Sequence, residues 1–236
     1  MNIEIWSDVV CPWCYIGKRR FEAALELFAH RDEVQVLWRS FELDPSAPRS
    51  TSGSLNDMLA QKMGVSTERA AAMNAHVSEL AAHEGLAYRL DIARPGNTFD
   101  AHQLIHLAAA HGLQAEAKER LLRAYFTEGA AIGDRTALVA LGTELGLAES
   151  DVRAALADDA YAAEVRADEA RARTFGIGGV PFFVIDERYG ISGAQPTALF
   201  LQALEQAWAD AHPLTMVSPP TADANCDDGS CAVPPH

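Results

Sequence analysis

The 236-residue chain has few cysteines and little positive charge. Its four cysteines are too few for a fold of this size to be built on disulfides. The 19 Lys and Arg residues are outnumbered by 33 Asp and Glu residues, which gives a net charge of -14. Nucleic acids and anionic membrane surfaces are bound by clustered basic residues, so this balance argues against both as partners.

Targeting signals and long apolar runs are also missing. No basic segment followed by an apolar stretch precedes the first cysteine, as a secretory signal peptide would require. No apolar run approaches the roughly 18 residues that a membrane span needs. Hydrophobic residues make up 49% of the chain and charged residues 22%, which are the values of a globular protein. We therefore expect a folded cytoplasmic protein; the mature form of a secreted protein, with its signal peptide removed, is the alternative.

The pattern near the N-terminus is that of a strand, a helix and a second strand. Alternating apolar residues predict a strand over residues 2–6. Apolar residues with helical spacing follow, so we expect a helix from near Cys11 to about His30. Residues 34–43 then predict the second strand.

Near the C-terminus the pattern is strand, strand and helix. Residues 180–186 and 189–193 predict a short hairpin, and an apolar stripe predicts a helix over residues 196–211. From residue 213 on, the chain holds five of its eleven prolines and no Lys or Arg, which predicts a flexible tail.

The middle of the chain is alanine-rich and predicts helices throughout. Three helices should end where a glycine precedes a leucine, at Gly85, Gly112 and Gly146. Asp134 and Ser150 are expected as N-caps of the helices that follow them.

Together these elements predict an α/β protein, in which β-α-β is followed by β-β-α and a large all-helical domain is inserted between the two halves. We expect residues 1–52 and 175–211 to form the α/β domain and residues 53–174 the helical domain. Residues 212–236 form the predicted tail, which is rich in Pro and Asp.

The sequence CPWC at residues 11–14 places two cysteines one helical turn apart. Cys11 falls where the strand ends and the helix begins, and the unpaired amides and dipole of a helix N-terminus favour a thiolate. Cys11 is therefore the candidate nucleophile, and Cys14 is the thiol that resolves a mixed disulfide. Half of a zinc site and a chance pair are the alternatives, but zinc usually needs four ligands and no second close pair lies nearby.

Three neighbours of the two cysteines are also candidates. Pro12 suits the first helical position. Trp13 either contacts a partner or packs in the core. Asp8 either acts as an acid near the thiols or caps the turn, and we favour the cap.

Pro181 opens a segment that otherwise has the pattern of a central strand, where proline is poorly tolerated. A cis bond between Val180 and Pro181 would explain it and would leave the Val180 backbone free to pair with an extended peptide. The alternative is a trans proline at the start of a strand.

Four segments, in this order and at this spacing, resemble the DsbA family of thioredoxin-like proteins: SDVVCPWCYIGK, FELDP, NTFDAH and FGIGGVPFFV. The resemblance covers about residues 2–211 and is closest to the cytoplasmic FrnE-like branch. That branch is related to 2-hydroxychromene-2-carboxylate isomerases and kappa-class glutathione transferases.

The resemblance implies a thioredoxin fold with a helical insertion before the third strand. It implies that Cys11 is the nucleophile, that Cys14 is the resolving thiol and that Val180-Pro181 is the cis-proline loop. Protein thiols and disulfides would be the substrates, a thiol would donate or accept electrons, and no cofactor or metal is implied.

Residues of the NTFDAH segment match positions that line the cleft in the isomerase relatives. Asn97 and Thr98 are therefore possible substrate-cleft residues, together with Pro12 and Trp13. For His102 we expect helix packing rather than catalysis.

The tail adds a second cysteine pair, Cys226 and Cys231, around a turn-forming Asp-Asp-Gly-Ser run. Its acidic surroundings disfavour the thiolate, so we expect this pair to relay electrons to or from the first pair at high effective concentration. A loose metal-binding tail and an inert extension are the alternatives.

Two other functions stay open at this point. One is a glutathione-dependent isomerase or transferase on the same fold, although such relatives commonly lack the second cysteine. The other is a binding module in which the four cysteines hold zinc.

Overall fold

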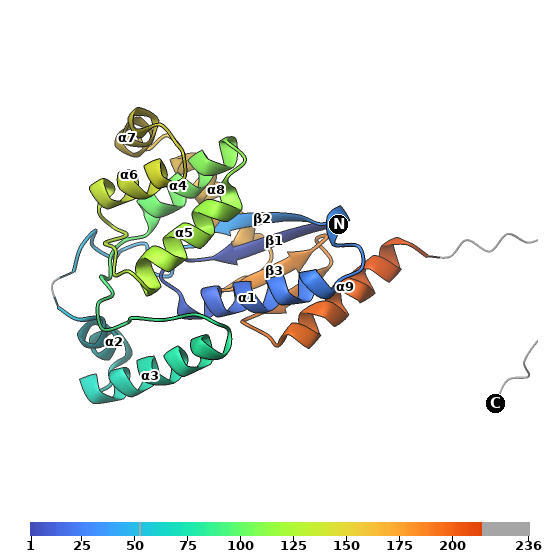
Figure 1. Cartoon of the computed structure of the whole chain (residues 1–236), viewed down its shortest axis with the longest axis horizontal. Coiled ribbons are helices and arrows are strands. Elements are labelled where there is room, and N and C mark those ends of the chain that lie inside the picture. The colour runs from blue at the N-terminus through green and yellow to red at the C-terminus, as the bar shows by residue number, and fades with distance from the viewer. Residues whose placement is uncertain (52, 214–236) are drawn as a thin grey trace, which may run out of the picture.

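The structure is a computed structural model that describes residues 1–51 and 53–213 (Figure 1). Within these residues one sheet has the strand order β2-β1-β3-β4. Its strands are β1 (Asn2–Ser7), β2 (Gln35–Ser40), β3 (Phe182–Ile185) and β4 (Tyr189–Ser192). β1 and β2 are parallel, whereas β1 with β3 and β3 with β4 are antiparallel. The predicted tail lies outside the described residues from Leu214 on, and so do its two cysteines.

The helices follow the predicted order. α1 spans Pro12–Leu27 and α9 spans Thr197–Ala211, and a short 3₁₀ helix, Arg31–Glu33, precedes β2. Between β2 and β3 in the chain lie α2 (Leu55–Met63), α3 (Thr67–His83), α4 (Phe99–Ala110), α5 (Gln114–Phe126), α6 (Arg135–Glu144), α7 (Glu149–Ala157) and α8 (Ala162–Thr174). Figure 1 shows α1 and α9 side by side over one face of the sheet, with the other helices gathered at one end. No helix of the described ranges is long and apolar enough to cross a membrane.

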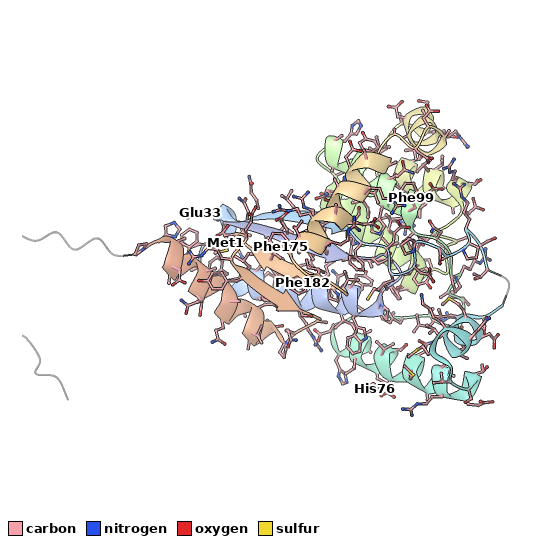
Figure 2. The ribbon with its side chains drawn as sticks, turned by 180° about the vertical axis from the view of Figure 1, so that it is seen from behind. Met1, Glu33, His76, Phe99, Phe175 and Phe182 are labelled. Carbon is pink, nitrogen blue, oxygen red and sulfur yellow. The ribbon has the colours of Figure 1, made fainter. Side chains whose placement is uncertain are left out.

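The alternation of side chains along β1 explains how helices cover both faces of the sheet. Ile3 and Ile5 point to the core shared with α1 and α9. Trp6 points to the opposite face, where its ring contacts Phe175 at a centroid distance of 5.7 Å. The view from behind shows α8, Phe175 and Phe182 on this second face (Figure 2).

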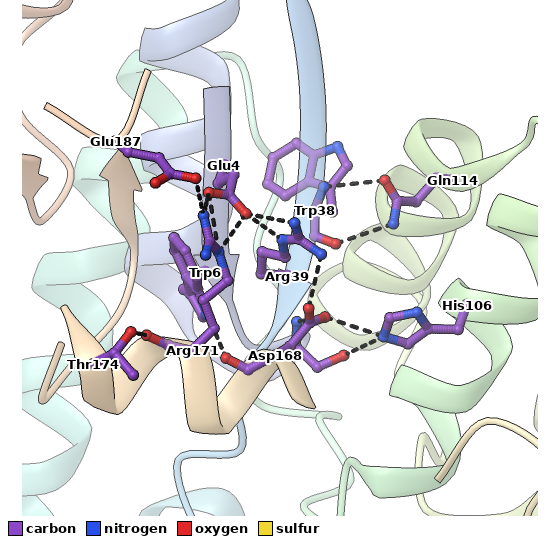
Figure 3. A network of polar contacts seen from close by, with 11 residues as sticks. Glu4, Trp6, Trp38, Arg39, His106, Gln114, Asp168, Arg171, Thr174 and Glu187 are labelled. Carbon is purple, nitrogen blue, oxygen red and sulfur yellow. Dashed lines mark hydrogen bonds and ion pairs between the residues drawn. The ribbon is translucent and has the colours of Figure 1, made fainter. Parts of the chain in front are cut away.

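A buried polar network holds α8 against this second face (Figure 3). The carboxylate of Asp168 accepts hydrogen bonds from Arg39 at 3.0 Å and from the Ser40 amide at 2.9 Å. The carboxylate of Glu4 accepts from Arg39 and from Arg171. Because each buried carboxylate has at least two partners, the network positions α8 without leaving an unpaired charge.

A second core fills the space between the helices and includes residues of α1. Tyr15 and Ile16 pack into this helical core, whereas Phe21 packs into the core under the sheet. The first turns of α1 therefore lie at the junction of the sheet and the helical part of the chain.

Most of the local expectations are confirmed. Gly85, Gly112 and Gly146 all have positive φ, as a left-handed helix end requires, and Asp134 accepts the amides of Thr136 and Ala137 as an N-cap.

Three expectations need correction. Ser150 is not an N-cap: α7 begins at Glu149, and the Ser150 hydroxyl donates to Asp151 instead of accepting an amide. The middle of the chain is not helical throughout, because residues 84–98 and 127–134 form connections between helices. β2 ends at Ser40, since the Leu43 amide turns away from the sheet to the carboxylate of Asp8.

At the outer edge of β2, one side chain pairs with both backbone groups of Trp38. The Gln114 amide accepts the Trp38 N–H and donates to the Trp38 carbonyl, both at 3.0 Å, as a neighbouring strand would (Figure 3). Gln114→Ala should lower the free energy of unfolding by about 2 kcal/mol, because both backbone groups lose their partner. Urea unfolding measures this, with the exposed Gln202→Ala as the matched control, expected to change it by less than about 0.5 kcal/mol. Equal effects of the two substitutions would contradict this role.

Candidate active site

The two cysteines of CPWC lie on the first turn of α1. Cys11 is the N-cap residue and is 4% exposed, and Cys14 is 1% exposed. The Cys11 amide donates to the Asp8 carbonyl at 3.3 Å, and the Cys14 amide donates to the Cys11 carbonyl at 3.0 Å. Pro12, at the first helical position, has no amide hydrogen to satisfy there. The turn between β1 and α1 therefore brings both thiols to the same end of the helix.

A segment 169 residues further along the chain meets the first thiol. Cys11 Sγ donates to the Val180 carbonyl at 3.5 Å. The Val180-Pro181 bond is cis, as expected from the sequence. Gly17 allows this approach, because a Cβ at that position would lie 3.0 Å from Pro181 Cγ. The structure thus brings together Cys11, Cys14, Val180 and Pro181.

The second thiol lies in surroundings that disfavour its charged form. Burial raises the pKa of Cys14 well above its ordinary value, and the neighbouring Cys11 acts in the same direction. The ammonium group of Lys118 opposes these effects. Cys14 is therefore held as a thiol until a nearby change in charge or geometry favours its deprotonation.

Asp8 is fully buried beside the thiols. Its Oδ2 accepts the Leu43 amide at 2.8 Å, and its Oδ1 lies 3.3 Å from His102 Nε2. Burial alone would raise the pKa of Asp8, but the His102 side chain and the Leu43 amide outweigh it, so this pKa lies below its usual range. The carboxylate does not cap the turn, which corrects the sequence-based expectation; only the Asp8 carbonyl takes part in it. His102 packs within α4, as expected, but also faces this carboxylate.

Lys118 of α5 is also buried in this region, with 1% exposure. Its Nζ donates to the Ser7 carbonyl at 3.1 Å and lies 5.8 Å from the centre of the Trp38 ring. Burial lowers the pKa of Lys118 to about 8, although Cys14 and Asp8 both favour its charged form. The helical part of the chain thus contributes a positive charge to the region of the thiols.

Tyr88 covers the first turn of α1 from the segment between α3 and α4. Its hydroxyl donates to the Pro12 carbonyl at 2.7 Å, and its ring stacks on Phe126 at 4.6 Å. Burial and the two thiols raise the pKa of Tyr88, so the phenol stays protonated and can donate. This contact joins the helical core to the CPWC turn.

The other predicted cleft residues have different surroundings. The Trp13 side chain is 41% exposed, which leaves it open to a partner and makes the core-packing alternative wrong. Asn97 donates to Glu42 at 3.4 Å and accepts the Phe99 amide at 2.9 Å. Thr98 is the buried N-cap residue of α4. Among the described contacts, Asn97 bonds to the start of α4 and to Glu42, and Thr98 is the N-cap residue of α4. Neither residue bonds to Cys11 or Cys14 in these contacts.

Sequence reasoning missed Lys118 and Tyr88. Lys118 lies in a helix with many charged residues, where its spacing alone does not separate it from a solvated lysine. Tyr88 lies in a short connection without a motif. In both cases the burial that makes the residue important depends on contacts with α1 and β1, which are more than 70 residues away in the chain.

Comparison with known proteins finds similar sequences and structures. The model of the DSBA-like thioredoxin domain family matches residues 2–205. A probable DsbA oxidoreductase from Streptomyces coelicolor is 47% identical and has a TM-score of 0.86 over 99% of both chains. YwbO of Bacillus subtilis, an uncharacterized protein by name, is 29% identical over 206 residues, or 86% of this chain and 96% of the relative.

A more distant structure shares the fold alone. The cytosolic disulfide reductase DsbM from Pseudomonas aeruginosa, solved with glutathione, is 19% identical with a TM-score of 0.60. The match covers 89% of this chain and 97% of that one.

Proposed function

Because the chain belongs to the DSBA-like thioredoxin domain family, we propose that it is a thiol-disulfide oxidoreductase that acts on protein disulfides as a reductase, isomerase or oxidase. The observation that carries the proposal is the placement of Cys11 and Cys14 on one helical turn, with Cys11 Sγ at 3.5 Å from the Val180 carbonyl. We also propose that this chemistry takes place in the cytoplasm.

The reaction proceeds in two exchange steps. The Cys11 thiolate attacks one sulfur of a substrate disulfide, a mixed disulfide forms, and the other substrate sulfur leaves as a thiolate that takes up a proton. Cys14 then loses its proton and attacks Cys11 Sγ, which releases the second substrate thiol and leaves a Cys11–Cys14 disulfide. Two electrons pass from the cysteine pair to the substrate, and the reverse sequence oxidises a dithiol.

The test is reduction of insulin by dithiothreitol, followed by the precipitation of its B chain. The protein should accelerate this reaction, and a rate equal to that of dithiothreitol alone would overturn the proposal. The rival function, glutathione-dependent isomerisation, is tested on a chromene carboxylate with glutathione by absorbance. The second thiol, Cys14, disfavours that rival, because the glutathione-dependent isomerases and transferases that this chain resembles commonly lack a second cysteine.

Cys226 and Cys231 lie outside the described residues, and we propose that they relay electrons to or from Cys11 and Cys14. A pair on the same chain acts at an effective concentration in the millimolar range, about 1 mM. Replacing both tail cysteines by serine should slow turnover several-fold while the first half-reaction keeps its rate. Unchanged turnover would contradict the relay. Stoichiometric zinc that survives dialysis would instead support a zinc-holding module.

A further inference from the structure

Tyr88 reaches the first turn of α1 from a segment that is held in place by the helical core. The Arg89 amide next to it donates to the Phe126 carbonyl at 2.6 Å, and the Tyr88 ring stacks on the Phe126 ring at a centroid distance of 4.6 Å. The Tyr15 ring stacks beside it, at a centroid distance of 6.2 Å. The phenol hydroxyl is therefore fixed where it donates to the Pro12 carbonyl at 2.7 Å.

This hydrogen bond is an addition to those of the helix itself. Pro12 is the first residue of α1, so its carbonyl is the acceptor for the amide four residues further on. A carbonyl oxygen has two lone pairs and can accept the phenol as well. The helix forms without a second donor at this carbonyl, so the contact with Tyr88 points to another role.

The peptide unit that contains the Pro12 carbonyl also contains the Trp13 amide. Trp13 is the second residue of α1, and its amide donates to no residue within the described part of the chain. The amides of the second and third helical residues are those that reach the side chain of the N-cap residue, which here is Cys11. The third, that of Cys14, donates to the Cys11 carbonyl. The Trp13 amide is therefore the available donor for the Cys11 sulfur.

A thiolate at Cys11 needs such a donor. As a thiol, Cys11 donates to the Val180 carbonyl at 3.5 Å. Once the proton is lost, the sulfur can only accept, and the Val180 carbonyl has no hydrogen to offer. A hydrogen bond to the carbonyl of a peptide unit polarises that unit and strengthens the hydrogen bond that its N–H donates.

We propose that Tyr88 is a positioning residue for the nucleophile: by donating to the Pro12 carbonyl, it orients and polarises the peptide unit whose Trp13 amide stabilises the Cys11 thiolate. This inference rests on the proposed function and deepens it, because it assigns a residue to the thiolate that starts the exchange. A more stable thiolate favours the reduced form of the cysteine pair. The Tyr88 hydroxyl should therefore make the Cys11–Cys14 disulfide a stronger oxidant.

The test removes only the hydroxyl, with Tyr88→Phe. In a background in which the other three cysteines are serine, the rate of alkylation of Cys11 by iodoacetamide is measured as a function of pH. Its midpoint should lie about half a pH unit higher in Tyr88→Phe, a factor of about three in the thiolate equilibrium, because one hydrogen bond strengthens the next by about 10–30%. With Cys14 restored, the equilibrium with glutathione should shift about threefold toward the protein disulfide.

Tyr15→Phe is the matched control. It also loses one hydroxyl from the aromatic stack, but that hydroxyl donates to Glu119 at 2.6 Å and not to the first turn of α1. Its alkylation profile and its equilibrium should match those of the wild type. The charged neighbours Asp8 and Lys118 are the same in all these proteins, and burial raises the pKa of the Tyr88 phenol, so its own titration does not enter the profile.

Two results would overturn the role of Tyr88. One is an alkylation profile of Tyr88→Phe equal to that of the wild type. The other is an equal shift in Tyr88→Phe and Tyr15→Phe, since any hydroxyl lost from the stack would then have the same effect. Alkylation needs no disulfide substrate. A wild type that fails to accelerate insulin reduction would therefore overturn the proposed function, while the alkylation profiles would still decide whether Tyr88 acts on Cys11.

Discussion

The Cys11→Ser variant should lose insulin reduction by a factor of at least about 10³, because a serine hydroxyl is not ionised near neutral pH and does not attack a disulfide. The variant should keep its fold, since oxygen replaces sulfur at a site where Cys11 Sγ makes one hydrogen bond, to the Val180 carbonyl. Initial rates of insulin precipitation measure the loss, and circular dichroism confirms folding.

Cys14→Ser is the matched variant for this experiment. Cys11 remains, so the first exchange step proceeds, but nothing attacks the mixed disulfide that forms. We therefore expect a stable covalent adduct with one half of a disulfide-bonded peptide dimer, visible as an added mass and removed by dithiothreitol. An adduct on Cys14 in the Cys11→Ser variant, with none on Cys11 in Cys14→Ser, would reverse the two roles.

The sequence was sufficient to predict the order of the strands and of the two helices beside them, and the place of Cys11 and Cys14 at the start of α1. Alternating apolar residues marked β1, and helical spacing marked α1, so Cys11 could be placed between them. Pro181 was identified because a proline conflicts with a strand pattern. These features are local, and local patterns are what a single sequence reveals.

The charged surroundings of the thiols could not be predicted in the same way. Asp8 was assigned to the nearest turn, whereas its carboxylate bonds the Leu43 amide and faces His102, 94 positions away. Lys118 becomes a buried charge only because α5 packs against the end of β1, where it reaches the Ser7 carbonyl. Such partners are set by the packing of elements that are remote in the chain.

The positive charge of Lys118 should govern the step that Cys14 performs. Lys118 lowers the pKa of Cys14 against the effect of burial, so Lys118→Met should raise that pKa further and slow release from the mixed disulfide by about tenfold. Stopped-flow measurement of product release under single-turnover conditions checks this. Lys62→Met is the matched control, because Lys62 is about half exposed and pairs with Asp44 at the surface. Equal release rates in the two variants would exclude an electrostatic role.

Lys118 should also leave a signature in the pH dependence of stability. Its pKa is about 8 in the folded protein, against 10.5 for an unperturbed lysine. Between these values the unfolded chain holds a proton that the folded protein has lost, so the contribution of Lys118 to stability rises with pH. Below pH 8 the folded protein must keep a buried ammonium group, at a cost of up to about 3 kcal/mol.

Relative to Lys118→Met, the wild type should therefore gain stability from pH 8 to 10.5. Urea unfolding at several pH values measures the difference between the two proteins, in which the opposing titration of Cys14 largely cancels. Parallel curves would mean that Lys118 titrates near its ordinary value, and its charge would then be stabilised by more than the contacts with Ser7, Asp8 and the thiols.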